Sequence, residues 1–292
     1  MNFEEIAKEF EYIFENIKKR ENNSKKESYR QIIALLNPIL LSNDFTTEQK
    51  VFAYWNISDN YALLRDYENT YQNHLEFEDY LKDKNENYKL MLICDATQKL
   101  SIISGGYEKY WNALYFDTIN KCKITSENYI IYFQVLRTAL YFRDNISDYK
   151  SIGKHALNKM VEFLKIYNND SQYLWFEMTY FDCLIKYNAQ FSIKQESILS
   201  KSYDCFEKLT TYLKIDEHTK KISINKYDSV LFGTYDSWNS LRPMYIQARC
   251  VQNYIITLID SGYYDLAKKC FELVGDKEFG SSYFKEKVKK LY

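Results

Sequence analysis

The stretch TTEQKVFAYWNISDNYALLRDYENTYQNHLEFEDYL, residues 46–81, decides the fold class of this chain. Thr46 and Gln49 have the spacing of a capping box at the start of a helix. Apolar residues then recur at helical steps, a short polar break follows, and a second amphipathic stretch continues to the end of the segment. The segment therefore predicts two antiparallel helices, over about 46–64 and 67–81.

The same alternation of long helix, short break and long helix extends in both directions from this pair. The chain has only 7 Gly and 2 Pro in 292 residues, too few for the frequent turns of β-sandwiches and barrels. We therefore expect an all-α protein. The expected helices cover about 3–17 and 27–41, then 88–104 with 107–120, 127–143 with 148–167, 171–188 with 193–214, and 243–261 with 263–274.

The expected organisation is a single domain over 1–292. Its parts are N-terminal helices over 1–45, helical hairpins over 46–214, an irregular insert over 215–241, and a C-terminal hairpin with a capping helix over 243–292.

Several residues stand at the spacing of a known helical repeat. The repeat has large, small and aromatic residues at fixed positions of two successive helices. The first-helix positions are matched by Tyr54, Ile57, Ser58 and Tyr61, and the start of the second helix by Tyr67 and Thr70. A second match consists of the turn glycine Gly262 and the second-helix residues Tyr264, Ala267 and Phe271. In these positions the chain resembles the tetratricopeptide-repeat family. The tyrosines that open second helices, Tyr67, Tyr107 and Tyr149, are 40 and 42 residues apart, longer than the family period of about 34. The resemblance implies degenerate repeats in a right-handed superhelix of stacked antiparallel helical hairpins, with a concave surface for a protein or peptide partner.

Composition limits the environment and the partners. The 39 basic and 40 acidic residues nearly cancel, so no overall field attracts nucleic acid or an anionic membrane, and we expect neither as a partner. The six cysteines lack metal-binding spacings, which favours reduced, mostly buried thiols. The start of the chain lacks the pattern of a secretory signal, and no apolar stretch reaches the length of a membrane span. These features predict a cytoplasmic protein, and the bias toward Lys, Asn, Ile and Tyr suggests an AT-rich genome.

Motifs for known chemistries are missing from the sequence. It contains no glycine-rich phosphate loop, HExxH, GxSxG or EF-hand string. We therefore predict no cofactor, no metal and no catalytic residue, and expect that the protein is not an enzyme. Of the three histidines, His74 and His155 are predicted to be packing residues within helices.

The insert over 215–241 breaks the helical period. A long irregular segment is often functional, whereas its apolar residues favour a packing flap, and both interpretations stay open. His218 follows two carboxylates at its start, so it is a candidate acid–base group or metal ligand, with a solvated loop histidine as the alternative.

Arginine is scarce, which makes its positions informative. The candidate partner-binding residues combine arginines with nearby aromatic and amide groups: Arg137, Trp238, Arg242, Tyr245, Arg249 and Asn253. Arg242, Tyr245 and Arg249 share one face of the helix that Pro243 opens, and guanidinium groups suit carboxylates and peptide backbones. The alternative is that Arg137 and Arg249 pair with buried acids such as Glu177 or Asp182.

Three functions remain open from the sequence. The leading hypothesis is a protein- or peptide-binding helical scaffold, bacterial and regulatory. The first alternative is an immunity or inhibitor protein for one cognate partner. The second is an enzyme whose site lies in the 215–241 insert.

Overall fold

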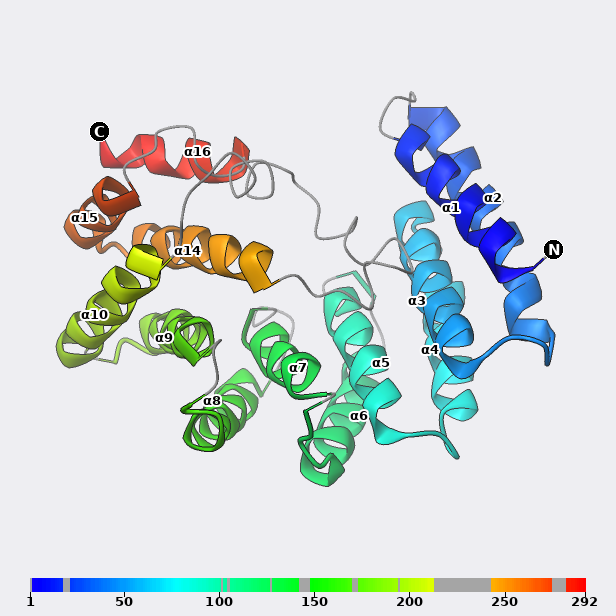
Figure 1. Ribbon diagram of the computed structural model, residues 1–292, viewed down its shortest axis with the longest axis horizontal. Helices are drawn as coiled ribbons and strands as arrows, with labels where there is room; N and C mark the ends of the chain where they lie inside the picture. Colours follow the sequence, from blue (N-terminus) through cyan, green and yellow to red (C-terminus); the bar gives the residue numbers. More distant parts are fainter. Residues whose placement is uncertain are drawn as a thin grey trace. The chain divides into compact units, whose positions relative to one another are not determined.

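The computed structural model describes residues 2–17, 22–100, 102–103, 106–126, 128–141, 148–169, 173–193, 195–212, 243–274 and 282–292. Within these ranges all regular elements are helical, with 13 α-helices and one short 3₁₀-helix (Figure 1). The prediction of an all-α protein is therefore confirmed. The insert predicted over 215–241 lies outside the described residues.

The chain divides into two compact units, the first reaching Tyr149 and the second starting at Lys150. The first unit contains α1 (Phe3–Ile17), α2 (Asn22–Leu41), α3 (Thr47–Leu64), α4 (Tyr67–Tyr80), α5 (Glu86–Lys99), α6 (Tyr107–Lys121) and α7 (Tyr129–Tyr141). The second contains α8 (Tyr149–Ile166), α9 (Tyr173–Gln190), α10 (Glu196–Tyr212), α14 (Pro243–Asp260), α15 (Tyr264–Val274), α16 (Ser282–Val288) and the 3₁₀-helix η2 (Lys289–Leu291). The expected grouping of 1–292 into one domain stays a prediction.

Packing in the first unit is mostly between helices that follow one another. α1 packs on α2, α2 on α3, α3 on α4 and α5 on α6, while α3 and α7 each also contact α5. This order is that of stacked helical pairs. The α3–α5 contact matters for the site below, because it brings two helices together around α4.

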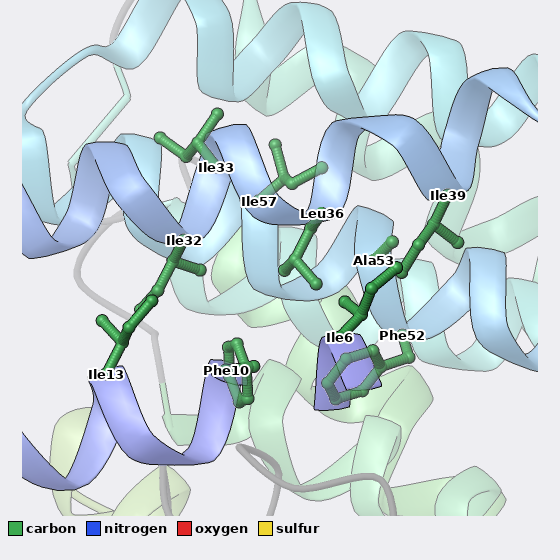
Figure 2. Close-up of a cluster of buried hydrophobic side chains, with 10 residues drawn as sticks. All are labelled: Ile6, Phe10, Ile13, Ile32, Ile33, Leu36, Ile39, Phe52, Ala53 and Ile57. Carbon is green, nitrogen blue, oxygen red and sulfur yellow. The ribbon is translucent and has the colours of Figure 1, made fainter. Parts of the chain in front are cut away.

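The hydrophobic core of α1, α2 and α3 shows why these sequences fold as helices. Apolar residues at three- and four-residue steps of each helix meet in one buried cluster (Figure 2). The cluster contains Ile6, Phe10, Ile13, Ile32, Ile33, Leu36, Ile39, Phe52, Ala53 and Ile57. The Phe10 ring packs edge-on against Phe52 at 5.4 Å and stacks on Phe14 at 5.8 Å.

The helix termini follow specific capping chemistry. The Thr46 side chain accepts from the Gln49 backbone N–H, and the Gln49 side chain accepts from the Thr46 N–H, so the predicted capping box is confirmed. At the other end of α3, Arg65 has a left-handed backbone with φ 62°. The Arg65 N–H donates to Ala62 and the next N–H donates to Tyr61, which is a Schellman cap.

Two further helices end in the same way. Ser192 follows α9 with φ 53°, and Gly262 follows α14 with φ 82°. Only Gly262 has the residue type that this conformation favours. The turn glycine predicted at 262 is thus confirmed, whereas the left-handed backbone of Arg65 and Ser192 was not predicted.

The second unit is built around α9 and α14. α9 packs on α10 and on α14, and α14 packs on α15 and α16. Pro243 is the first residue of α14, as predicted, where its missing N–H costs little. None of the six cysteines forms a disulfide, and five of them are buried.

The predicted helix boundaries agree with the structure to within a few residues, with two larger differences. α2 begins at Asn22 rather than 27, because its first turns are polar and carry no apolar period. α5 ends at Lys99 rather than 104. No described helix combines the length and the apolar character that a membrane span requires.

Candidate functional site

The predicted partner-binding residues fall in both units. Arg137 lies half-buried in α7, with its guanidinium 4.5 Å from the centre of the Tyr141 ring. Asn253 lies half-buried in α14. The side chains of Tyr245 and Arg249 in α14 are not among those described, and Trp238 and Arg242 lie outside the described residues, as does His218. The predicted grouping of these residues into one surface stays a prediction.

The acids proposed as alternative arginine partners have other partners in the structure. The buried carboxylate of Asp182 accepts a hydrogen bond from the Thr257 hydroxyl and lies 3.8 Å from the Lys186 ammonium. Glu177 accepts from the Tyr173 hydroxyl at 3.2 Å. The Thr257–Asp182 hydrogen bond connects α14 to α9, whereas the other two contacts lie within α9.

A buried polar cluster forms where α3, α4, α5 and α6 meet, and sequence analysis did not find it. His74 on α4 is fully buried and is its centre. Ser58 Oγ and Asp95 Oδ2 lie 2.7 Å and 2.6 Å from His74 Nε2. The Tyr107 hydroxyl lies 2.6 Å from His74 Nδ1, so both ring nitrogens have polar partners.

An ion pair extends this cluster toward the surface. Lys99, almost fully buried, bonds to Asp59 on α3 and lies 3.1 Å from Asp95 Oδ1 on its own helix. Asp59 is one-third exposed, so this end of the cluster reaches solvent. Two carboxylates therefore share one ammonium group.

The charged groups of the cluster shift one another's pKa values. Burial alone would raise the pKa of Asp95, but the Lys99 ammonium and the hydrogen bonds with His74 and Ser58 outweigh it and lower the pKa to about 2. Burial would lower the pKa of Lys99, but Asp59 and Asp95 together raise it above its usual value. Desolvation, assisted by Asp95, raises the pKa of Asp59 against the opposing effect of Lys99.

Serine, histidine and aspartate together invite comparison with a hydrolase triad, and the geometry does not fit one. In a triad the acid and the serine hydroxyl bond to different nitrogens of the histidine ring. Here Ser58 and Asp95 both face Nε2, and Tyr107 occupies Nδ1. Ser58, His74 and Asp95 are also fully buried. The arrangement suits a structural connection among four helices.

His74 was predicted to be a packing residue, and its burial confirms this. The sequence does contain one signal for the rest of the cluster: Asp95 and Lys99 are an i,i+4 pair on a helix face that is otherwise apolar. Ser58 occupies the small-residue position of the repeat pattern, which lets the His74 ring approach α3.

A groove in the first unit is the candidate binding site. It holds about 860 Å³, within the range of ligand pockets, and opens to solvent beside α1, α2 and the start of α3. It is lined by Asn2, Phe3, Ile6, Ala34, Leu35, Pro38, Ser42, Asp44, Phe45 and Gln49. Ala34 and Pro38 are exposed, whereas Phe3, Leu35 and Phe45 pack against the buried core and fix the apolar floor.

The groove has one charged group among the described residues that line it. This group is the Asp44 carboxylate, which accepts from the Ser42 hydroxyl at 2.9 Å. Pro38 stands inside α2 and has no N–H to donate to the Ala34 carbonyl, which would otherwise be bonded within the helix. Pro38 lies within the helix expected over 27–41, and we did not predict this groove from the sequence.

The α1 helix beside the groove is acidic. It carries five glutamates and one lysine, a side-chain charge of −4 in a chain whose net charge is −1. Both helix N-termini at the groove are already capped, α1 by a mutual Asn2–Glu5 pair and α3 by Thr46 and Gln49.

Compared with protein-family models, curated proteins and solved structures, the chain has no match.

Proposed function

We propose that this chain is a helical scaffold that binds a protein or a peptide. The observation that carries the proposal is the groove lined by α1, α2 and the start of α3, which has a fixed apolar floor and a polar rim. Such a combination is typical of surfaces that take an apolar anchor and orient it by hydrogen bonds.

The packing of consecutive helices supports this function. Stacked pairs present long, pre-formed surfaces without folding on binding, which limits the entropy lost when a partner is captured. We propose a tetratricopeptide-like, right-handed stacking of the hairpins. We also propose a regulatory role in the bacterial cytoplasm, in keeping with thiols that form no disulfide and are mostly buried.

Affinity capture with the full chain tests the proposal. The purified protein serves as bait in native lysate, and captured proteins are identified by mass spectrometry, then re-measured with pure components. Ala34→Trp, at an exposed position in the groove, should weaken the interaction at least about tenfold by filling the floor. Arg249→Ala tests the alternative surface predicted from sequence.

Each outcome has a distinct meaning. A purified partner lost with Ala34→Trp supports binding through the groove. A partner lost only with Arg249→Ala supports the scaffold function and moves the site to α14. If no protein or peptide binds the purified chain in either form, the scaffold function is wrong.

A further inference from the structure

We infer that the groove beside α1 takes a basic amphipathic peptide segment, with an apolar side chain on the floor and lysine or arginine at the rim. This inference rests on the proposed scaffold function and names the chemistry of its partner. Three features of the first unit lead to it: the apolar floor, the acceptor groups around it, and the acidic helix at its edge.

The floor calls for an apolar anchor. Phe3, Leu35 and Phe45 are held by the core cluster beneath them, so their exposed atoms form a surface that does not need to rearrange. Ala34 leaves room above α2, because its side chain is short and exposed. One leucine-sized or aromatic side chain can therefore enter without displacing a residue of the protein.

The polar groups call for a donor. The Asp44 carboxylate lies at the rim. The Ala34 carbonyl receives no helical hydrogen bond from residue 38, because proline has no N–H. An ammonium or guanidinium group has donors only, so it can donate to acceptors of this kind without leaving an acceptor of its own buried.

The charge of α1 favours the same partner. α1 has Glu4, Glu5, Glu9, Glu11 and Glu15 against Lys8, and residues of its first turn line the groove. A negative edge accelerates the approach of a cationic segment and opposes an anionic one.

Capped helix ends argue against an anionic ligand. The α1 and α3 N-termini would attract anions through free N–H groups. At each terminus one such N–H, that of Glu5 or of Gln49, already donates to the side chain of Asn2 or Thr46. Fewer N–H groups are therefore left for an anion, and the charged side chain that lines the groove among the described residues, Asp44, is negative.

Two synthetic peptides of twelve residues test the inference directly. Both place leucines at helical spacing; one fills the other positions with lysine and the second with glutamate. Each is labelled with a fluorophore, and its affinity for the full chain is measured by fluorescence polarisation at low and high salt. We expect the lysine peptide to bind at least about tenfold more tightly than the glutamate peptide, with an advantage that shrinks as salt rises.

Variants at one position separate charge from size. Ala34→Lys and Ala34→Gln add side chains of similar length, and both suit an exposed helix position. Ala34→Lys should weaken binding of the lysine peptide about tenfold relative to Ala34→Gln, and Asp44→Asn should weaken it about threefold. Glu272→Gln on α15 removes one exposed carboxylate in the second unit and should change nothing. Circular dichroism verifies that each variant is folded.

The results separate this inference from the scaffold function. Equal effects of Ala34→Lys and Ala34→Gln, tighter binding of the glutamate peptide, or binding of neither peptide would overturn the basic-peptide inference. A captured natural partner with an acidic or neutral binding segment would also overturn it, while leaving the scaffold function intact.

Discussion

His74 Nε2 and Asp95 Oδ2 lie 2.6 Å apart, and neither side chain is exposed to solvent. The contact joins α4 to α5, and each residue carries the connection further: Asp95 to Lys99, and His74 to Ser58 and Tyr107. Buried polar groups with several partners make the loss of any one of them costly, because the others are left without partners in a medium of low dielectric constant.

Asp95→Asn should lower the free energy of unfolding by about 3 kcal/mol, because Lys99 loses a charge partner and His74 loses its strongest acceptor. Urea denaturation followed by circular dichroism measures the change. Asp117→Asn is the control: its i,i+4 pair with Lys121 is largely exposed, and its loss should cost less than about 0.5 kcal/mol. Equal losses in both variants would show that the cluster contributes no more than a surface pair.

The cluster also predicts acid sensitivity. The folded-state pKa of Asp95, about 2, lies below its usual value of 3.8. Its ionised form therefore stabilises the fold fully above about pH 4, and that contribution is lost as the pH falls from about 4 toward 2. Unfolding free energies measured across this range should fall less steeply for Asp95→Asn than for the native chain. A parallel decline in both proteins would contradict the assignment.

Substitutions at the three left-handed cap residues should change the free energy of unfolding in opposite directions. Arg65→Gly and Ser192→Gly should each raise the free energy of unfolding by about 0.5–1 kcal/mol, because glycine removes the strain of a positive φ. Gly262→Ala should lower it by about 1 kcal/mol. A Cβ there meets no atom within 4 Å, so the cost is conformational and not steric. Thermal unfolding of the three variants side by side checks the signs.

The α1 helix offers a matched test of its buried face. Phe10→Ala should destabilise the protein by about 3–5 kcal/mol, since its ring is 1% exposed and contacts two other rings. Tyr12→Ala, two residues away with 63% of its surface exposed, should cost less than about 0.5 kcal/mol. Similar losses would mean that α1 does not pack on α2 and α3 in solution.

The helices could be predicted from the sequence because their signals are local. Periodic apolar residues, the Thr46–Gln49 capping box and the proline at 243 each act within one turn of the chain. The turn glycine at 262 was visible for the same reason. Arg65 and Ser192 were not, because their left-handed backbone is set by the turn as a whole and not by residue preference.

The two sites required information that a single helix does not contain. Ser58, His74 and Asp95 are separated by 16 and 21 residues and meet only when three helices pack. The groove depends on how α1 lies beside α2, although Pro38 within a helical pattern was a usable hint. The arginine-based prediction depends on α14 side chains and residues outside the described ranges, and it stays a prediction.

The cluster around His74 also affects how the first unit comes apart. In a simple array of repeats, each helix pair interacts with its immediate neighbours, so ends can fray one pair at a time. Here Asp59 on α3 is tied to Lys99 on α5, and His74 on α4 to Tyr107 on α6, so two connections each skip a helix. Both connections join the pair α3–α4 to the pair α5–α6 through buried polar groups, so separating these two pairs would leave those groups without partners. The amides of α3 to α6 should therefore exchange with solvent as one cooperative block.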